Sequence, residues 1–157
     1  MLSYIKKIKK LRKEKLFSIC LAESCTGGMI SSKLTSISGS SDFFDGSVVS
    51  YSNDLKNRLL KVPKTTISKY GAVSHQTALS MVKGLRKISQ SEILVSVTGV
   101  AGPKGGTNQK PVGLVYIGIK KGKKTLVKKN YFKSNKRRLI QKATVNKALN
   151  LILSFAK

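Results

Sequence analysis

The chain has 157 residues, 40% of them hydrophobic, which is the length of about one domain with enough apolar side chains for an ordinary core. Its 31 Lys and Arg residues against 6 Asp and Glu give a formal net charge of +25. No apolar run approaches the roughly 20 residues of a membrane span, so no membrane association is expected. Cys20 and Cys25 form no CxxC pair, which excludes a disulfide scaffold and favours the reducing cytoplasm. One histidine, two cysteines and six acids also argue against a metal site.

The positive charge is mostly lysine, because only five of the 31 basic residues are Arg. Proteins that recognise nucleic acids favour Arg, because its planar guanidinium can donate two parallel hydrogen bonds to phosphate or guanine. They also stack bases on aromatic rings. This chain has five Phe, five Tyr and no Trp, so a nucleic-acid partner is disfavoured. A lysine excess along the whole chain also fits the codon bias of an AT-rich genome. No acid follows Glu92, and we expect the C-terminal third to attract small anions.

Hydrophobic periodicity predicts the elements in chain order. They are an amphipathic helix at 2–14, a buried strand at 16–22, a helix that ends near 35, a strand at 46–51, a short helix through 60, a helix at 75–89, a buried strand at 93–98, a hairpin of strands at 112–119 and 124–132, and a helix at 136–155. Strands alternate with helices up to residue 98, and an antiparallel pair follows. This order predicts an α/β fold: a single three-layer αβα domain over 1–157 with a mixed, mostly parallel sheet of about five strands.

The segment Glu-Ser-Cys-Thr-Gly-Gly at 23–28 follows the first predicted strand and leads into a helix. Active sites of open α/β sheets gather at the carboxyl ends of strands, and a helix N-terminus offers free N–H groups. Ser24 at this place fits a nucleophile with an oxyanion hole, or part of a phosphate cradle, and a plain helix cap is the alternative. Cys25 is a rival nucleophile, but the only histidine, His75, lies far along the chain, so a packing role is favoured.

Tyr51 ends the second predicted strand, and Lys56 falls in the first turn of the helix that follows. The positive end of the helix dipole and partial burial should both lower the pKa of this lysine. A neutral lysine can act as the general base for a serine, as in Ser-Lys variants of the catalytic triad. Taken alone, Lys56 is one of many lysines, and a solvated helix face is the simpler interpretation.

A glycine-rich loop from Thr98 to Gly106 follows the clearest buried strand. Such a loop can form an anion-binding nest of backbone N–H groups. It is not a Walker A loop, since no Gly-Lys-Ser/Thr closes it, and not a dinucleotide fingerprint, since a strand follows rather than a helix. A mobile loop without a ligand is the alternative interpretation.

Five motifs follow one another along the chain. They are Ala-Glu-Ser-Cys-Thr-Gly-Gly at 22–28, Tyr51 with Lys56, Tyr-Gly-Ala-Val-Ser at 70–74, Thr-Gly-Val-Ala-Gly-Pro at 98–103 and Lys-Pro-Val-Gly at 110–113. Together and in this order they resemble the CinA C-terminal domain family, whose stand-alone members include nicotinamide-nucleotide amidases. The resemblance covers residues 5–155.

The resemblance implies a three-layer αβα fold with one antiparallel strand, and hydrolysis of the carboxamide of nicotinamide mononucleotide to nicotinic acid mononucleotide and ammonia. It implies a catalytic set of Ser24, Tyr51 and Lys56, no metal or other cofactor, and a homo-oligomer, either a dimer or larger. Ser24 would attack the amide carbonyl, neutral Lys56 would take its proton, and Tyr51 would relay or hold it. Backbone N–H groups near 26–28 would stabilise the oxyanion. The residues expected to hold this small-molecule nucleotide substrate are Glu23, Thr26, Gly27, Gly28, Thr98, Gly99, Gly102, Gly105, Gly106 and Lys136.

One segment departs from the family pattern, which is Phe-x-Gly-Asp-Arg with a second Arg four residues further on. Here it reads Phe-Lys-Ser-Asn-Lys at 132–136, and residue 140 is Ile. Lys136 therefore stands where the family has Arg, and it brings charge without the planar fork. We expect Arg137 or Arg138 to compensate only with a shift in helix register.

This departure supports a second hypothesis, a degenerate CinA-like protein that binds a nucleotide or a protein partner without amidase activity. A third hypothesis, a nucleic-acid-binding module, rests on the charge alone. It predicts a steep salt dependence of DNA affinity and no effect of Ser24→Ala.

Overall fold

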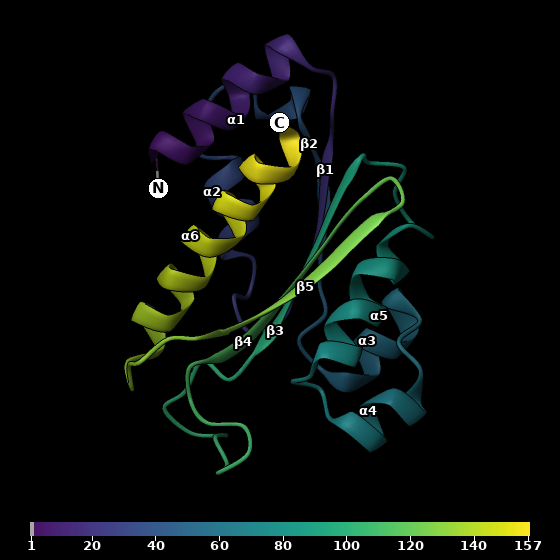
Figure 1. Cartoon of the computed structure of the whole chain (residues 1–157), viewed down its shortest axis with the longest axis vertical. Coiled ribbons are helices and arrows are strands. Elements are labelled where there is room, and N and C mark those ends of the chain that lie inside the picture. The colour runs from purple at the N-terminus through teal and green to yellow at the C-terminus, as the bar shows by residue number, and fades with distance from the viewer. Residues whose placement is uncertain (1) are drawn as a thin grey trace.

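The computed structural model describes residues 2–157, and its centre is a five-stranded sheet in the order β2-β1-β3-β4-β5 (Figure 1). The strands are β1 (Ile19–Glu23), β2 (Phe44–Val49), β3 (Ile93–Gly99), β4 (Leu114–Lys121) and β5 (Lys124–Tyr131). β1 pairs in parallel with β2 and β3, whereas β4 runs antiparallel to both β3 and β5. Four strands therefore point one way and β4 opposes them, which confirms the predicted mixed sheet.

Helices cover both faces of the sheet, which confirms the predicted three-layer α/β fold (Figure 1). One face carries α1 (Leu2–Glu14), α2 (Met29–Leu34) and α6 (Arg137–Ala156). The other carries α3 (Asn53–Leu60), α4 (Lys64–Tyr70) and α5 (His75–Leu85), and a 3-10 turn at Ser40–Asp42 precedes β2. Among residues 2–157, no helix combines the length and the apolar character that a membrane span needs.

The element boundaries differ from the prediction in several places. β2 spans Phe44–Val49 rather than 46–51, so Tyr51 lies beyond its end, and β4 spans Leu114–Lys121 rather than 112–119. α4 was not predicted, because Ile67 is the only large aliphatic side chain between Pro63 and Tyr70 and gives no periodicity. α5 ends at Leu85, and residues 86–88 continue as turns rather than as helix. β1 begins at residue 19 rather than 16, with Leu16 83% exposed.

The buried side chains form two cores, one on each face of the sheet. Val95 and Val97 of β3 belong to the larger core, which α1, α2 and α6 close. Leu94, the residue before Val95, faces the other way and belongs to the smaller core beneath α5. The predicted inward face of α5 is confirmed, since its four residues Ala78, Met81, Val82 and Leu85 are fully buried. Full burial of an aliphatic side chain of this size contributes about 1.5–3 kcal/mol.

The pairing register of β1 and β2 contains one irregularity. Ile19 pairs with Phe44, but the next residue of β1 pairs with Gly46, so Asp45 is an extra residue on β2. The Asp45 carboxylate accepts hydrogen bonds from the hydroxyls of Ser89 (2.6 Å) and Ser91 (3.1 Å). These contacts tie the extra residue to the segment that precedes β3.

Three sequence motifs meet at one edge of the sheet because each follows a parallel strand. Glu23, the last residue of β1, pairs with Val49 of β2 and with Val97 of β3. Ser24 therefore emerges beside the turn after β2 and beside Thr98 at the end of β3. The fold brings together at this edge residues that are more than 70 positions apart in the chain.

Candidate active site

The turn at 24–28 is held by the carboxylate of Glu23. That carboxylate is fully buried and accepts hydrogen bonds from the N–H groups of Gly28 (3.1 Å), Ile30 (3.1 Å) and Ser31 (2.8 Å) and from the Ser31 hydroxyl (2.5 Å). Gly27 and Gly28 have φ of 57° and 90°, in the left-handed region that glycine adopts readily. Glu23 therefore acts as the cap of α2, a positioning role rather than the substrate contact expected from the sequence.

Ser24 and Lys56 form a buried pair at the end of β1. The Ser24 N–H donates to the carbonyl of Val97 at 3.1 Å, which fixes the serine against β3. Lys56 Nζ lies 3.1 Å from Ser24 Oγ, and the two residues are only 1% and 7% exposed. The structure thus places the predicted nucleophile and base within hydrogen-bond distance, and the alternative of a solvated Lys56 is wrong.

Lys56 has two further acceptors, the carbonyls of Ser50 (2.9 Å) and Tyr51 (3.1 Å). A carbonyl can only accept, whereas a hydroxyl can also donate. A neutral amine can therefore give its two N–H groups to the carbonyls and turn its lone pair to the hydroxyl of Ser24. The arrangement is suited to removing the Ser24 proton.

The surroundings of Lys56 favour the neutral amine. Burial lowers the pKa of its ammonium, and the nearby Cys25 thiol opposes this with a smaller effect. The one ion pair among residues 2–157 joins Arg58 and Asp54 on the surface of α3, so no carboxylate neutralises Lys56. A lysine that is buried without a counterion loses its proton more easily than a solvated one.

Cys25 is also buried, and desolvation raises the pKa of its thiol to about 12. A thiol with this pKa is almost entirely protonated at neutral pH and is a poor nucleophile. The structure agrees with the packing role favoured from the sequence.

The Tyr51 side chain does not contact the serine–lysine pair by hydrogen bonding. Its ring is 57% exposed, and its hydroxyl accepts from Nη2 of Arg137 at 2.8 Å. What Tyr51 gives to Lys56 is its main-chain carbonyl. The predicted relay through the phenol is therefore not formed in this conformation.

A cavity of about 190 Å³ opens beside the pair. It is lined by Ser24, Cys25, Tyr51, Asn53, Lys56, Ala72, Val73, Thr98, Gly99, Ala101 and Arg137. The structure thus collects the three predicted catalytic residues and two predicted binding residues, Thr98 and Gly99, around one space. The Thr98 hydroxyl donates to the carbonyl of Ala72 at 2.7 Å and so connects two residues that line the cavity.

The remaining predicted binding residues do not line this cavity. They are Glu23, Thr26, Gly27, Gly28, Gly102, Gly105, Gly106 and Lys136. Gly105 and Gly106 are exposed in the glycine-rich loop, and Lys136 is exposed where α6 begins.

In the turn at 24–28, some backbone N–H groups already donate a hydrogen bond within the protein and others do not. Gly27 N–H donates to the Ser24 carbonyl at 3.0 Å, and Gly28 N–H donates to Glu23. These two amides, which we expected to stabilise an oxyanion, are occupied. Among the hydrogen bonds of residues 2–157, none is donated by the N–H group of Cys25 or Thr26. They are the free donors in the two residues that follow Ser24.

Two residues of α6 reach the site that were not among the expected site residues, although Arg137 was considered as a substitute for Lys136. Arg137 donates to the carbonyl of Gly102 at 3.0 Å and to the Tyr51 hydroxyl, and Gln141 donates to the carbonyl of Cys25 at 3.0 Å. They lie four residues apart, so they share one helix face, and this spacing is the signal that the sequence contained. Arg137, which we expected to compensate for Lys136 only with a shift in helix register, enters the cavity as the first residue of α6, one position beyond Lys136.

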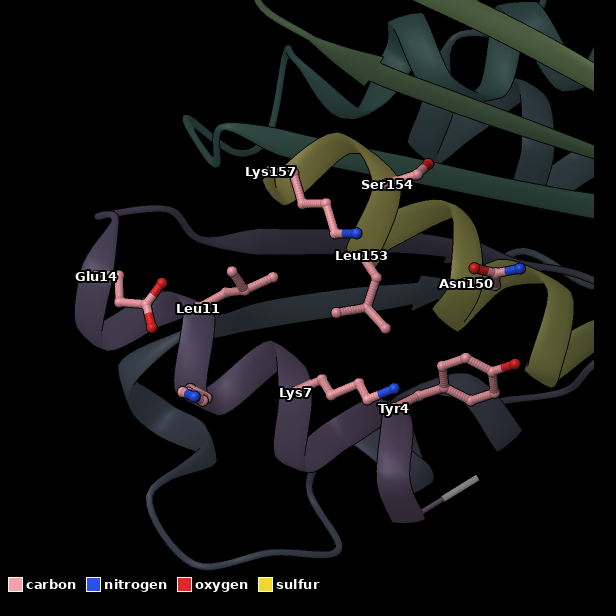
Figure 2. A pocket seen from close by; sticks show the side chains of 9 residues that line it. Tyr4, Lys7, Leu11, Glu14, Asn150, Leu153, Ser154 and Lys157 are labelled. Atoms are coloured by element: carbon pink, nitrogen blue, oxygen red, sulfur yellow. The ribbon is translucent and has the colours of Figure 1, made fainter.

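A larger hollow of about 390 Å³ lies between α1 and the end of α6 (Figure 2). Tyr4, Lys7 and Leu11 of α1 line it opposite Leu153, Ser154 and Lys157. Its one hydroxyl on α6, that of Ser154, donates to the carbonyl of Leu151, and among the described residues no hydrogen bond joins it to the lysines that line the same hollow. This hollow therefore lacks the pair of groups that the cavity near Ser24 has. Nowhere in 2–157 do three or more His, Cys, Asp or Glu side chains gather as a metal ion would need.

The fold and the site define a three-layer α/β domain with a buried serine–lysine pair at the carboxyl edge of its parallel strands. The CinA C-terminal domain family model matches residues 2–156, and the chain belongs to this family. A CinA-like protein of Fusobacterium nucleatum is 47% identical over 144 residues, and one of Prochlorococcus marinus is 46% identical over 156 residues. These matches cover 92% and 96% of this chain but 35% and 36% of those proteins, so the chain spans about a third of their length.

The crystal structure of competence/damage inducible protein CihA from Agrobacterium tumefaciens is similar to this fold. Its TM-score is 0.96 at 38% identity, over 99% of this chain and 95% of that one. The competence damage-inducible protein A from Klebsiella pneumoniae gives a TM-score of 0.92 at 25% identity, over 98% and 94% of the two chains.

Proposed function

We propose that this protein is a serine amidase that hydrolyses the carboxamide of nicotinamide mononucleotide to nicotinic acid mononucleotide and ammonia. The observation that carries the proposal is the buried Lys56 Nζ at 3.1 Å from Ser24 Oγ, without a counterion. A lysine in that place serves to activate a serine. The choice of substrate rests on the family resemblance.

The first half-reaction forms an acyl-enzyme. Ser24 Oγ bonds to the carboxamide carbon while its proton passes to neutral Lys56 Nζ. The free N–H groups of Cys25 and Thr26 donate to the oxygen on which negative charge develops. The Lys56 ammonium then gives its proton to the amide nitrogen, the C–N bond breaks and ammonia leaves.

The second half-reaction regenerates the enzyme. Water attacks the acyl carbon and gives a proton to Lys56 Nζ. Lys56 returns this proton to Ser24 Oγ as the ester bond breaks, and the carboxylic acid leaves. Every proton transfer in this sequence uses Lys56, because among the described residues no hydrogen bond joins the Tyr51 hydroxyl to Ser24 or Lys56. We assign Tyr51 the positioning of Lys56 through its carbonyl.

The test is ammonia release from nicotinamide mononucleotide by the purified full chain in the presence of EDTA. We expect wild type to release ammonia, and Ser24→Ala and Lys56→Met to lose at least about 10³-fold in kcat. Ser154→Ala, in the hollow between α1 and α6, is the matched control and should keep wild-type activity.

Absence of release by folded wild type, both with and without EDTA, would refute the amidase and favour the binding-protein hypothesis. Full activity of Ser24→Ala would refute the serine mechanism. Loss of activity on addition of EDTA alone would point to a metal requirement that the proposed chemistry does not include.

A further inference from the structure

We propose, on the basis of the proposed function, that Arg137 recognises the phosphate of the nucleotide substrate. The Arg137 side chain lines the same cavity as Ser24, and the residue is also exposed, which places it at the cavity mouth. Its guanidinium has five N–H donors and uses Nη1 on Gly102 and Nη2 on Tyr51. Donors therefore remain for an acceptor that enters from solvent.

The cavity is large enough for only one end of the substrate, so the other end must lie outside it. A cavity of about 190 Å³ is smaller than the roughly 300 Å³ from which drug-sized ligand pockets begin. It can take the ring that carries the carboxamide next to Ser24, while the rest of a mononucleotide lies at the mouth. The phosphate then falls in the region where Arg137 is exposed.

Among residues 2–157, the charge of Arg137 has no acidic partner. The one ion pair of the described chain is Arg58 with Asp54, and no acid follows Glu92 in the sequence. The guanidinium meets only neutral acceptors, a carbonyl and a phenol. An anionic ligand would supply the missing counter-charge, and a planar guanidinium matches two oxygens of a phosphate.

The start of α6 strengthens this reasoning. Lys136, Arg137 and Arg138 occupy the positive end of the helix dipole, where acids are normally stabilising. The first turn has no acid, and no side chain caps it. A bound phosphate beside Arg137 would relieve this repulsion.

The start of α6 selects Arg137 rather than Lys136 for this role. Lys136 is the N-cap residue with extended backbone, and Arg137 is the first residue of the helix. Lys136, which stands where the family pattern has Arg, does not line the cavity, whereas Arg137 does. We therefore assign phosphate recognition to Arg137 and not to Lys136, which we expected to bind the substrate.

The experiment compares calorimetric binding of nicotinamide mononucleotide and nicotinamide riboside, which lacks the phosphate. Ser24→Ala serves as the background because it cannot turn the ligand over. We expect the mononucleotide to bind about 10- to 100-fold more tightly than the riboside, as for hydrogen bonds to a charged group. Arg137→Gln should reduce this preference to about 3-fold or less, Arg137→Lys should keep part of it, and Arg138→Gln should keep all of it.

Three results would overturn the inference. They are a preference that survives Arg137→Gln in a protein of native circular dichroism, loss of the preference in Lys136→Gln alone, and no binding of the mononucleotide. Failure of the proposed function looks different: wild type releases no ammonia while the preference for phosphate still depends on Arg137.

Discussion

Replacing Lys56 with Met tests the protonation state that the serine mechanism requires. Met fills a similar volume and cannot titrate, so the difference in free energy of unfolding between wild type and Lys56→Met isolates the buried amine. In the unfolded chain Lys56 titrates near 10.5, and in the folded protein burial lowers its pKa. Between these two pKa values the unfolded state binds one more proton than the folded state.

The sign and size of the effect follow from this proton balance. Stability rises with pH wherever the unfolded state binds more protons, at about 1.4 kcal/mol per pH unit for one proton. The destabilisation is complete below the folded-state pKa and disappears above about 10.5. Wild type should therefore gain stability relative to Lys56→Met as pH rises through this window.

The measurement is urea unfolding of both proteins from pH 6 to 10.5 at fixed salt. Lys142→Met, an exposed position on α6, is the matched control and should give a flat difference. A flat difference for Lys56→Met up to pH 10 would show an ordinary pKa and a charged amine at neutral pH. Lys56 could not then accept the proton of Ser24, and the mechanism would be refuted.

Three further predictions concern the frame of the site. Cys25 should resist iodoacetamide at pH 8 in the folded protein and react in urea, because its pKa is raised to about 12, and equal rates in both states would contradict its burial. Gly84→Ala should destabilise by about 3 kcal/mol or more in urea unfolding, since a Cβ there would lie 1.9 Å from the carbonyl of Leu60. Gly46→Ala, with nothing within 4 Å of a Cβ, is its control and should unfold near the wild-type midpoint. Glu23→Gln should lose about 3 kcal/mol, because an amide nitrogen would face backbone N–H donors; unchanged stability would rule out the capping role.

The sequence was sufficient for the fold because the pattern of each main element is periodic. The buried run of β3 and the apolar face of α5 specify their own secondary structure and their inward residues. α4 escaped prediction since it has no apolar stripe, and its formation depends on the Pro63 start and on packing against α5. Periodicity reports burial, and an element with little burial gives little signal.

The site was predictable in its composition and less so in its contacts. Ser24 and Lys56 each follow a parallel strand, and the carboxyl ends of parallel strands lie at the same edge of the sheet. This was enough to predict that the two residues lie close together. The direction of a side chain at a turn depends on distant neighbours. Tyr51 turns to Arg137 from the far end of the chain, and no local pattern encodes that contact.

The extra residue of β2 lies at the end of the strand remote from the site. Because Ile19 pairs with Phe44 and the next residue of β1 pairs with Gly46, every pair up to Glu23 and Val49 would stay in register without Asp45. Asp45 instead connects β2, through the hydroxyls of Ser89 and Ser91, to the segment that leads into β3. Ser24 and Lys56 come within 3.1 Å only when β1, β2 and β3 are paired in this register. During refolding, recovery of activity would thus report correct registration of the sheet rather than mere compaction of the chain.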